Sequence, residues 1–83
     1  MKRLEFSWHA LEALRERELN VMWIERAIRE PEWTIPDPRR KGVERRFLRI
    51  PEHGKRILRV VVVESLHEIR ILTAFFDRRA RRP

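Results

Sequence analysis

The stretch RILRVVVVE, residues 56–64, decides the fold of this 83-residue chain. Val60–Val63 place apolar side chains on both faces of an extended segment, so the stretch predicts a central β-strand that is covered in part on both sides. Further strands are expected at Val43–Ile50 and Glu68–Phe76. The breaker residues at Pro51–Gly54 predict a turn between the first two of these three strands.

Two helices and one short strand are expected before this sheet. Ser7 can cap a helix from Trp8 to about Glu18, and Asn20 can cap a second helix that Pro31 ends. A short strand follows at Trp33–Ile35. Each cap is flanked by the apolar pair of a hydrophobic staple, Phe6 with Leu11 and Leu19 with Ile24.

This order, α-α-β-β-β-β, predicts an α+β fold in which two N-terminal helices pack on one face of a small antiparallel sheet. A chain of this length is expected to form a single domain over residues 1–77. Residues 78–83 carry four arginines and are expected to be a basic tail.

The pairing of the last two strands can also be predicted. If that hairpin turns on Leu66, Arg59 lies opposite Thr73, and Val61 lies opposite Ile71. One face of the hairpin then carries Arg59 and Thr73 together with Ile57, Val63, Ile69 and Phe75. A one-residue shift of register would change these partners and could exchange the faces.

Charge is divided unevenly along the chain. Residues 1–36 hold six basic and seven acidic side chains, whereas residues 37–83 hold fourteen basic and six acidic ones. The second segment is also the one that predicts strands, so several arginines are expected to stand on a sheet. Guanidinium groups can meet a phosphate with two parallel hydrogen bonds, which favours a polyanionic ligand.

The composition indicates in which cell compartment the protein is expected and which ligand chemistry its basic residues favour. The chain has no cysteine, and its charged N-terminus is not followed by an apolar stretch, so a secretory signal is not expected. No apolar run is long enough for a membrane span, which favours a cytoplasmic protein. Only three of the twenty basic residues are lysines. This bias fits phosphate recognition, and genomic base composition or growth at high temperature explains it equally well.

His9 is the candidate for proton transfer. Cleavage of RNA through its 2′-hydroxyl needs a base for the hydroxyl proton, a cation for the phosphate and an acid for the leaving oxygen. An unperturbed imidazole titrates near pH 6.5 and can serve as base or acid. The alternative is a partly buried histidine that fixes the start of the helix by a hydrogen bond.

Three further residues are candidates for the same site. Arg17 lies within the apolar arc of the first helix and could reach a phosphate, or it could snorkel or pair with Glu44 or Glu64. Arg59 interrupts an apolar strand, and Thr73, its predicted neighbour, could orient the same ligand. A solvated sheet face is the alternative for Arg59.

Other basic side chains are candidates for nucleic-acid binding, although solvated or ion-paired arginines are more common. These residues are Arg46, Arg70, Arg39, Arg40 and Lys41. The histidines lack metal-ligand spacing, so no metal is expected, and no pattern points to a cofactor. The tryptophans could stack on bases, but core or interface packing is the more frequent role for such residues.

Taken together, these residues resemble a mostly bacterial family, the domain of unknown function 4258, over Phe6 to about Phe76. The resemblance is carried by four segments: the opening Phe6-Ser7-Trp8-His9-Ala10, which is followed by Ala13, Arg15, Arg17 and Leu19, the helix end Ala27-Ile28-Arg29-Glu30-Pro31-Glu32, the basic strand Arg56–Val63 and the closing Ile69–Phe75. The family commonly ends in Thr-Ala-Tyr, where this chain has Phe75 in place of the tyrosine.

That family is grouped with the RelE/ParE-like toxins and is similar to the BrnT ribonuclease toxins. The resemblance implies a RelE-like fold, RNA as the substrate (ribosome-bound mRNA being one form), and an acidic antitoxin that covers the basic face. The leading hypothesis is therefore an RNA-binding, toxin-like protein that could be a metal-independent endoribonuclease.

Two other interpretations remain open at this point. A non-catalytic module could hold nucleic acid or an acidic protein with the same arginines, and the lack of tyrosine favours it. A homodimer could form through exposed tryptophans or a sheet edge, with the charge serving solubility.

Overall fold

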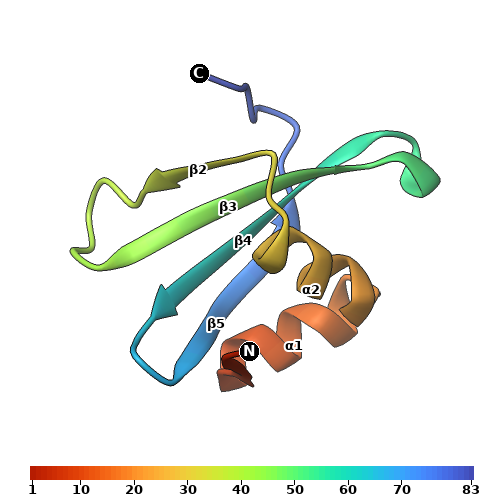
Figure 1. Cartoon of the computed structure of the whole chain (residues 1–83). Coiled ribbons are helices and arrows are strands. Elements are labelled where there is room, and N and C mark those ends of the chain that lie inside the picture. Colours follow the sequence, from red (N-terminus) through yellow and green to blue (C-terminus); the bar gives the residue numbers. More distant parts are fainter.

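The computed structural model describes all residues, 1–83, and places five strands and two helices around one core (Figure 1). The elements are β1 (Arg3–Phe6), α1 (Trp8–Glu16), α2 (Val21–Arg29), β2 (Trp33–Pro36), β3 (Val43–Ile50), β4 (Arg56–Glu64) and β5 (Glu68–Phe76), with one 3₁₀ turn at Pro51–His53. Their order in the sheet is β1-β5-β4-β3-β2. The α+β class and the three long strands are confirmed.

The prediction of a four-stranded antiparallel sheet is wrong, because an additional strand, β1, pairs in parallel with β5. The sheet is therefore mixed and has five strands. Leu4 and Phe6 pack against the core, while Arg3 and Glu5 alternate with them. Four residues are too few for this period-2 pattern to stand out in the sequence, and the pairing joins distant parts of the chain.

Both predicted helix caps are confirmed. The Ser7 hydroxyl accepts a hydrogen bond from the N–H of Ala10 at 3.0 Å, and the Asn20 side chain accepts one from Met22 at 2.9 Å. However, α1 ends at Glu16 rather than near Glu18. Glu18 has a φ of 50°, in the left-handed region, which turns the chain sharply into α2.

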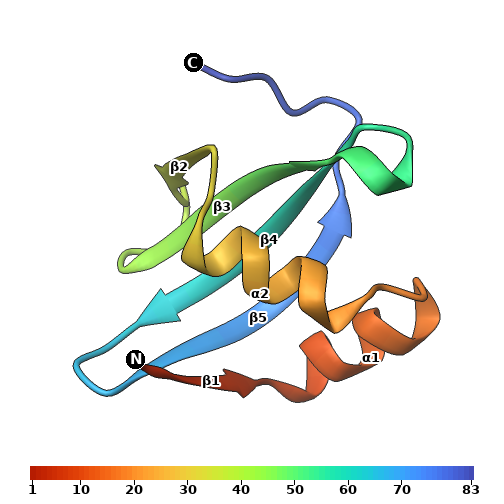
Figure 2. The same cartoon turned by 45° about the vertical axis from the view of Figure 1, so that its right-hand side comes forward.

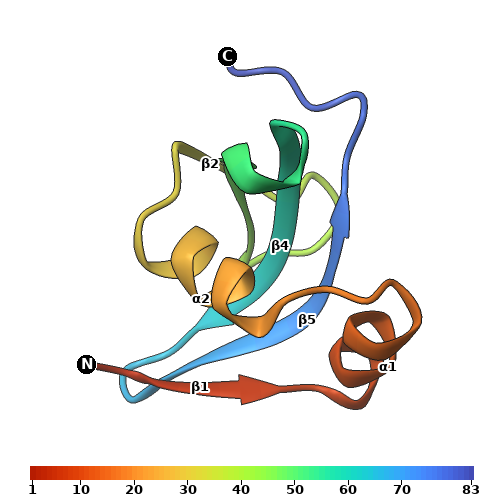
Figure 3. The same ribbon diagram turned by 90° about the vertical axis from the view of Figure 1, so that its right-hand side faces the viewer.

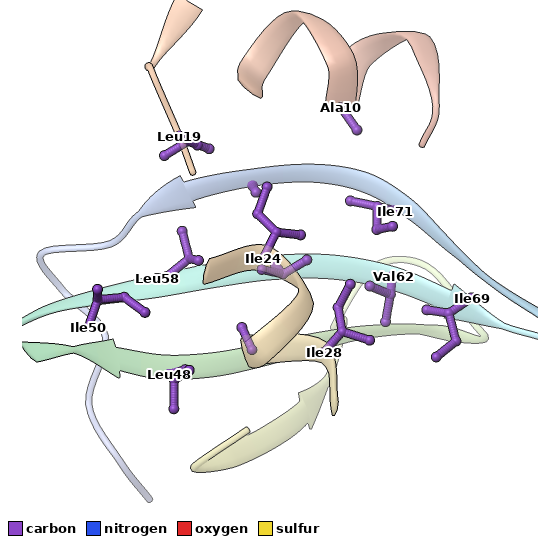
Figure 4. Packing of buried hydrophobic residues seen from close by; sticks show 13 residues of the cluster. Ala10, Leu19, Ile24, Ile28, Leu48, Ile50, Leu58, Val62, Ile69 and Ile71 are labelled. Atoms are coloured by element: carbon purple, nitrogen blue, oxygen red, sulfur yellow. The ribbon is translucent and has the colours of Figure 1, made fainter. Parts of the chain in front are cut away.

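The core lies between the helices and one face of the sheet. In Figure 2, α2 crosses β4 while α1 lies beyond β5 as a continuation of β1. Figure 4 shows α2 inserting Ile24 and Ile28 towards the strands. Burial of one such side chain is worth about 1.5–3 kcal/mol. The buried cluster consists of Ala10, Leu19, Ile24, Ala27, Ile28, Leu48, Ile50, Leu58, Val60, Val62, Ile69, Ile71 and Ala74.

The predicted pairing of β4 with β5 is wrong. Arg59 pairs with Phe75, and Val61 pairs with Thr73, so neither Arg59–Thr73 nor Val61–Ile71 is a cross-strand pair. The register of a hairpin depends on its turn, and the sequence near residues 65–67 does not specify a turn type. A second cause is an irregularity in the middle of β5.

That irregularity is a β-bulge at Leu72. The register shifts between the partners of Val61 and Val62, so Leu72 is one extra residue in β5. The bulge exchanges the faces of the residues before it. Ile69 and Ile71 consequently enter the core beneath the helices, whereas the sequence pattern had placed them on the face of Arg59.

Neither helix is long and apolar enough to cross a membrane.

Candidate functional site

A groove of about 730 Å³ lies between α1 and β5 and contains five of the predicted site residues. In Figure 3, α1 stands beside β5. His9 and Arg17 come from α1 and its end, Arg40 from the β2–β3 connection, and Arg70 and Thr73 from β5. The remaining lining residues are Ser7, Trp8, Glu12, Ala13, Glu16 and Leu72.

Ser7 joins the two walls of this groove. Its backbone N–H donates to the carbonyl of Ile71 at 2.9 Å, and its hydroxyl donates to the carbonyl of Leu72 at 3.0 Å. The same hydroxyl caps α1 through Ala10. One side chain therefore fixes the first turn of α1, which carries His9, against the bulge of β5.

The bulge also brings Arg70 and Thr73 together. In a regular strand, residues three positions apart point to opposite faces. Because Leu72 is an extra residue, Arg70 pairs with Val63 and Thr73 pairs with Val61, so both lie on the sheet face opposite the core. Their shared position follows from backbone geometry that the sequence pattern did not predict.

His9 is exposed, with 88% of its side chain accessible. The alternative of a partly buried histidine is therefore wrong. Its Nδ1 lies 3.8 Å from Oε1 of Glu12, one helical turn away. Glu12 is a site residue that the sequence reasoning missed, and its i,i+3 spacing from His9 was the available signal.

The groove carries a small positive charge. Arg17, Arg40 and Arg70 line it together with Glu12 and Glu16, which leaves one formal positive charge when His9 is neutral. Both Arg17 and Arg70 are exposed, and neither has a carboxylate at ion-pairing distance. The pairing of Arg17 with Glu44 or Glu64 is thus not formed, and two guanidinium groups are free to bind an anion.

Glu5 of β1 is the strand neighbour of Arg70. It lies 3.6 Å from Nε of Arg3 instead, and Arg3 also pairs with Glu68 at 3.1 Å. This arrangement engages the nearby carboxylates with Arg3 and leaves the guanidinium of Arg70 without a partner.

Asp37 holds Arg40 at the rim of the groove. Its buried carboxylate accepts the backbone N–H groups of Arg39 and Arg40 and also pairs with the Arg40 and Arg45 side chains at 3.2 and 3.3 Å. The hydrogen bond from Arg39, followed by those from Arg40, keeps the pKa of this carboxyl well below its usual value, although burial opposes the shift. The connection between β2 and β3 is thereby ordered.

Arg59 lies outside the groove, and its guanidinium is already paired. Nη1 donates to Asp77 at 2.9 Å, and the guanidinium lies 5.0 Å from the ring centre of Phe75 and 5.9 Å from that of Phe47. Only 19% of the side chain is accessible, so the alternative of a solvated sheet face is also wrong. Trp33 stacks on Phe47 at 4.8 Å and continues this row across the sheet.

Arg46 is likewise unavailable for a ligand. It lies on the core side of the sheet, pairs with Glu44 at 2.7 Å and with Glu64, and donates to the carbonyl of Ile28 at 3.0 Å. Burial would lower its pKa, but the hydrogen bonds to the two carboxylates outweigh it and raise the pKa. Arg39 and Lys41 are exposed but do not line the groove.

The tryptophans divide between exposed and packed positions. Trp8 is exposed at the edge of the groove, whereas Trp23 packs against the core and Trp33 against Phe47. No group of three or more His, Asp or Glu side chains is placed to hold a metal ion.

These features define a small α+β domain with an open, arginine-bearing groove between its first helix and its last strand. The chain belongs to the family described as a domain of unknown function, DUF4258, whose family model matches residues 6–76. No curated protein and no solved structure matches the chain.

Proposed function

We propose that this protein binds RNA through the α1–β5 groove and cleaves it with His9 as the proton carrier. The observation that supports the proposal is the convergence of His9, Arg17, Arg70 and Thr73 in one open groove. Separate segments contribute these residues, and neither arginine has a carboxylate partner.

The chemistry can be written with these groups alone. Neutral His9 takes the proton of the 2′-hydroxyl, and the 2′-oxygen attacks the adjacent phosphorus. The bond from phosphorus to the 5′-oxygen breaks, leaving a 2′,3′-cyclic phosphate and a 5′-hydroxyl that takes its proton from water. Arg17 and Arg70 bind the phosphate oxygens, and Thr73 orients them through its hydroxyl.

Glu12 would assist His9 in this scheme. Its carboxylate stands 3.8 Å from Nδ1 and would stabilise the imidazolium that forms when the 2′-hydroxyl proton is taken. Nε2 would then face the substrate. This arrangement supplies a proton carrier and its carboxylate partner without a tyrosine, which the chain lacks.

Binding without cleavage is the second candidate function, and the acidic residues of the groove favour it. Glu12 and Glu16 offset two of the three arginines, so the groove neutralises little of the phosphate charge. A module of this kind would hold nucleic acid or an acidic protein, with Arg17 and Arg70 as its contacts.

We also propose that the protein is a member of the RelE/ParE-like toxins, with the partner, substrate and cell compartment that this membership implies. A helix pair on one face of a sheet supports that classification. An acidic antitoxin would then cover Arg17, Arg40 and Arg70, and the protein would act in the cytoplasm on free or ribosome-bound mRNA. Homodimers remain part of the proposal through the exposed Trp8.

Binding and cleavage of a fluorescent single-stranded RNA would test both candidate functions. Arg70→Gln is expected to weaken binding about tenfold, because it removes a charge-assisted phosphate contact. Arg49→Gln is the matched control, since Arg49 is an exposed β3 arginine outside the groove. Equal affinities of these two variants would contradict the proposed site.

His9→Ala distinguishes cleavage from binding alone. The exposed side chain can be removed without opening the core, so the variant is expected to bind RNA but to lose strand scission. If the wild-type protein binds RNA with a steep salt dependence and leaves it intact, the non-catalytic function is supported instead.

A further inference from the structure

A second hollow adjoins the groove and shares Arg17 with it. This hollow, of about 440 Å³, is lined by Arg17, Glu18, His53, Arg56, Phe75 and Phe76. Its volume lies within the range of about 300–1,000 Å³ that small-ligand sites occupy. Because Arg17 lines both spaces, a ligand whose phosphate it binds in the groove can extend directly into the hollow.

The walls of the hollow are aromatic and cationic. The Phe76 ring centre lies 4.7 Å from that of His53 and 4.7 Å from the guanidinium carbon of Arg56, with Trp23 packed edge-on at 5.9 Å. These contacts hold the ring of Phe76 in place. Phe75 leaves the strand on the opposite face, and Arg59 lies 5.0 Å from its ring centre.

Two flat surfaces remain for a ligand. Arg56 is exposed and has no carboxylate partner, and its hydrogen-bonding distance of 3.1 Å to Nε2 of His53 fixes the plane of its guanidinium. Phe75 is half-buried and contributes part of its ring. Unpaired bases stack on aromatic rings and on guanidinium planes, and Glu18 adds an acceptor for a base amino group.

We propose that this hollow holds the unpaired base of the nucleotide next to the phosphodiester in the α1–β5 groove. The ligand is therefore single-stranded RNA, because a base within a duplex is already paired and stacked and cannot enter the hollow. This inference rests on the proposed function and extends it by a base-binding subsite of Arg56 and Phe75.

The experiment compares the binding of one complete single-stranded RNA with that of a series of abasic strands of the same sequence. Each strand of the series lacks the base at one position, and that position differs from strand to strand. Wild-type protein is expected to lose about tenfold in affinity at one position of the series, the loss typical of one stacked base. A blunt duplex of the same sequence is expected to bind more weakly than the complete strand.

Variants then assign that loss to the hollow. In Arg56→Gln the difference between complete and abasic RNA is expected to disappear, while Lys55→Gln, an exposed neighbour outside the hollow, retains it. Phe75→Leu is a second variant in which this difference is expected to disappear. If Phe75→Leu is unstable, the result for Arg56→Gln is sufficient. Equal binding of all abasic strands, equal binding of the duplex, or a difference that survives in Arg56→Gln would overturn the subsite.

The two proposals fail in different ways. If Arg17→Gln and Arg70→Gln weaken RNA binding but no abasic position matters, the groove stands and the subsite is wrong. If RNA binding does not respond to Arg17 or Arg70, or if RNA does not bind at all, the proposed function is wrong and the subsite is overturned with it.

Discussion

At the scale of single residues, the arginines of this protein differ in whether their guanidinium groups already have hydrogen-bond and ion-pair partners within the fold. Arg17 and Arg70 are exposed beside the groove and have no carboxylate partner, whereas Arg46 and Arg59 are largely buried and paired. A residue type that suggested one common role in the sequence therefore has at least two roles in the fold. Of these four, only Arg17 and Arg70 combine an exposed guanidinium with the lack of a carboxylate partner, whereas the unpartnered Nε of Arg59 is buried and out of reach of a phosphate.

Replacing Arg46 is expected to reduce stability without weakening RNA binding by the folded protein. Arg46→Met removes the donor to Oε1 of Glu64 and to the carbonyl of Ile28, while Lys2 still pairs with Oε2 of Glu64, and the free energy of unfolding should fall by about 2 kcal/mol. Urea unfolding of this variant and of the exposed control Arg49→Met measures the difference. Equal loss in both variants would show that the buried network contributes nothing specific.

His9 is expected to confer a pH dependence on cleavage. Its side chain is 88% accessible and its nearest carboxylate is 3.8 Å away. If neutral His9 is the base, the cleavage rate at saturating RNA should rise with pH as the imidazole loses its proton. In His9→Ala this rise should be absent, and a profile unchanged by the substitution would exclude His9 as the base.

At the scale of elements, the junction of β1, α1 and β5 positions the site. Ser7 caps the helix and donates to the bulge carbonyl of Leu72, so one hydroxyl links three elements. The bulge in turn places Arg70 and Thr73 on one face. A bulge beside a binding groove is a common way to re-aim side chains.

Removal of the Ser7 hydroxyl is expected to affect both stability and binding. Ser7→Ala should lower the free energy of unfolding by about 1–2 kcal/mol, because it removes a helix cap and leaves the Leu72 carbonyl unpaired. RNA affinity of the folded variant should also fall. Ser65→Ala is the control, since Ser65 donates to Glu68 at an exposed turn distant from the groove. A Ser7→Ala variant as stable as the control would contradict this role.

At the scale of the whole molecule, charge is arranged by pairing and not by position along the chain. Most of the acidic residues in the basic segment neutralise arginines, such as Asp37 with Arg45 and Asp77 with Arg59. Pairing therefore removes arginines such as Arg46 and Arg59 from the basic side chains of residues 37–83 that could contact an anion. Arg70 and Thr73 instead meet residues of the nearly neutral N-terminal segment in the groove.

Three paired carboxylates predict acid sensitivity of the fold. The pKa of Asp37 is lowered mainly by the N–H of Arg39, that of Glu52 by Arg26, and that of Glu64 by Lys2 and Arg46. A carboxyl whose pKa is lower in the folded protein adds stability above its unfolded pKa, about 3.9–4.3, and loses this contribution as the pH falls towards the folded pKa.

Unfolding by urea is therefore expected to show constant stability from these groups near neutral pH and a decline below about pH 4. Asp37→Asn should be less stable at pH 7 and should decline less steeply in acid, because one titrating carboxyl is gone. A wild-type protein whose stability does not fall between pH 4 and 2 would contradict these pairings.

The features of the fold that could be predicted from the sequence were those that depend on residues close together in the chain. Ser7 and Asn20 were identified as caps because a cap depends on the next two or three residues. The strands at residues 43–50, 56–64 and 68–76 followed from apolar patterns and breakers. β1 was missed because it pairs with a strand at the other end of the chain, and the bulge at Leu72 was missed because the turn before β5 does not specify the register of the β4–β5 hairpin.

The amino-acid sequence alone determined the helices, the long strands and the residue types available for phosphate chemistry. These features depend on the spacing of capping, apolar and turn residues that are close together in the sequence, so the sequence alone specifies them. Only the tertiary structure decided which charged groups meet. Long-range pairing turned Arg46 inwards and placed Arg59 beside Asp77, and it left Arg70 free next to His9 and Arg17. The physical reason is that a guanidinium binds the nearest carboxylate, and nearness in a folded sheet depends on register and bulges.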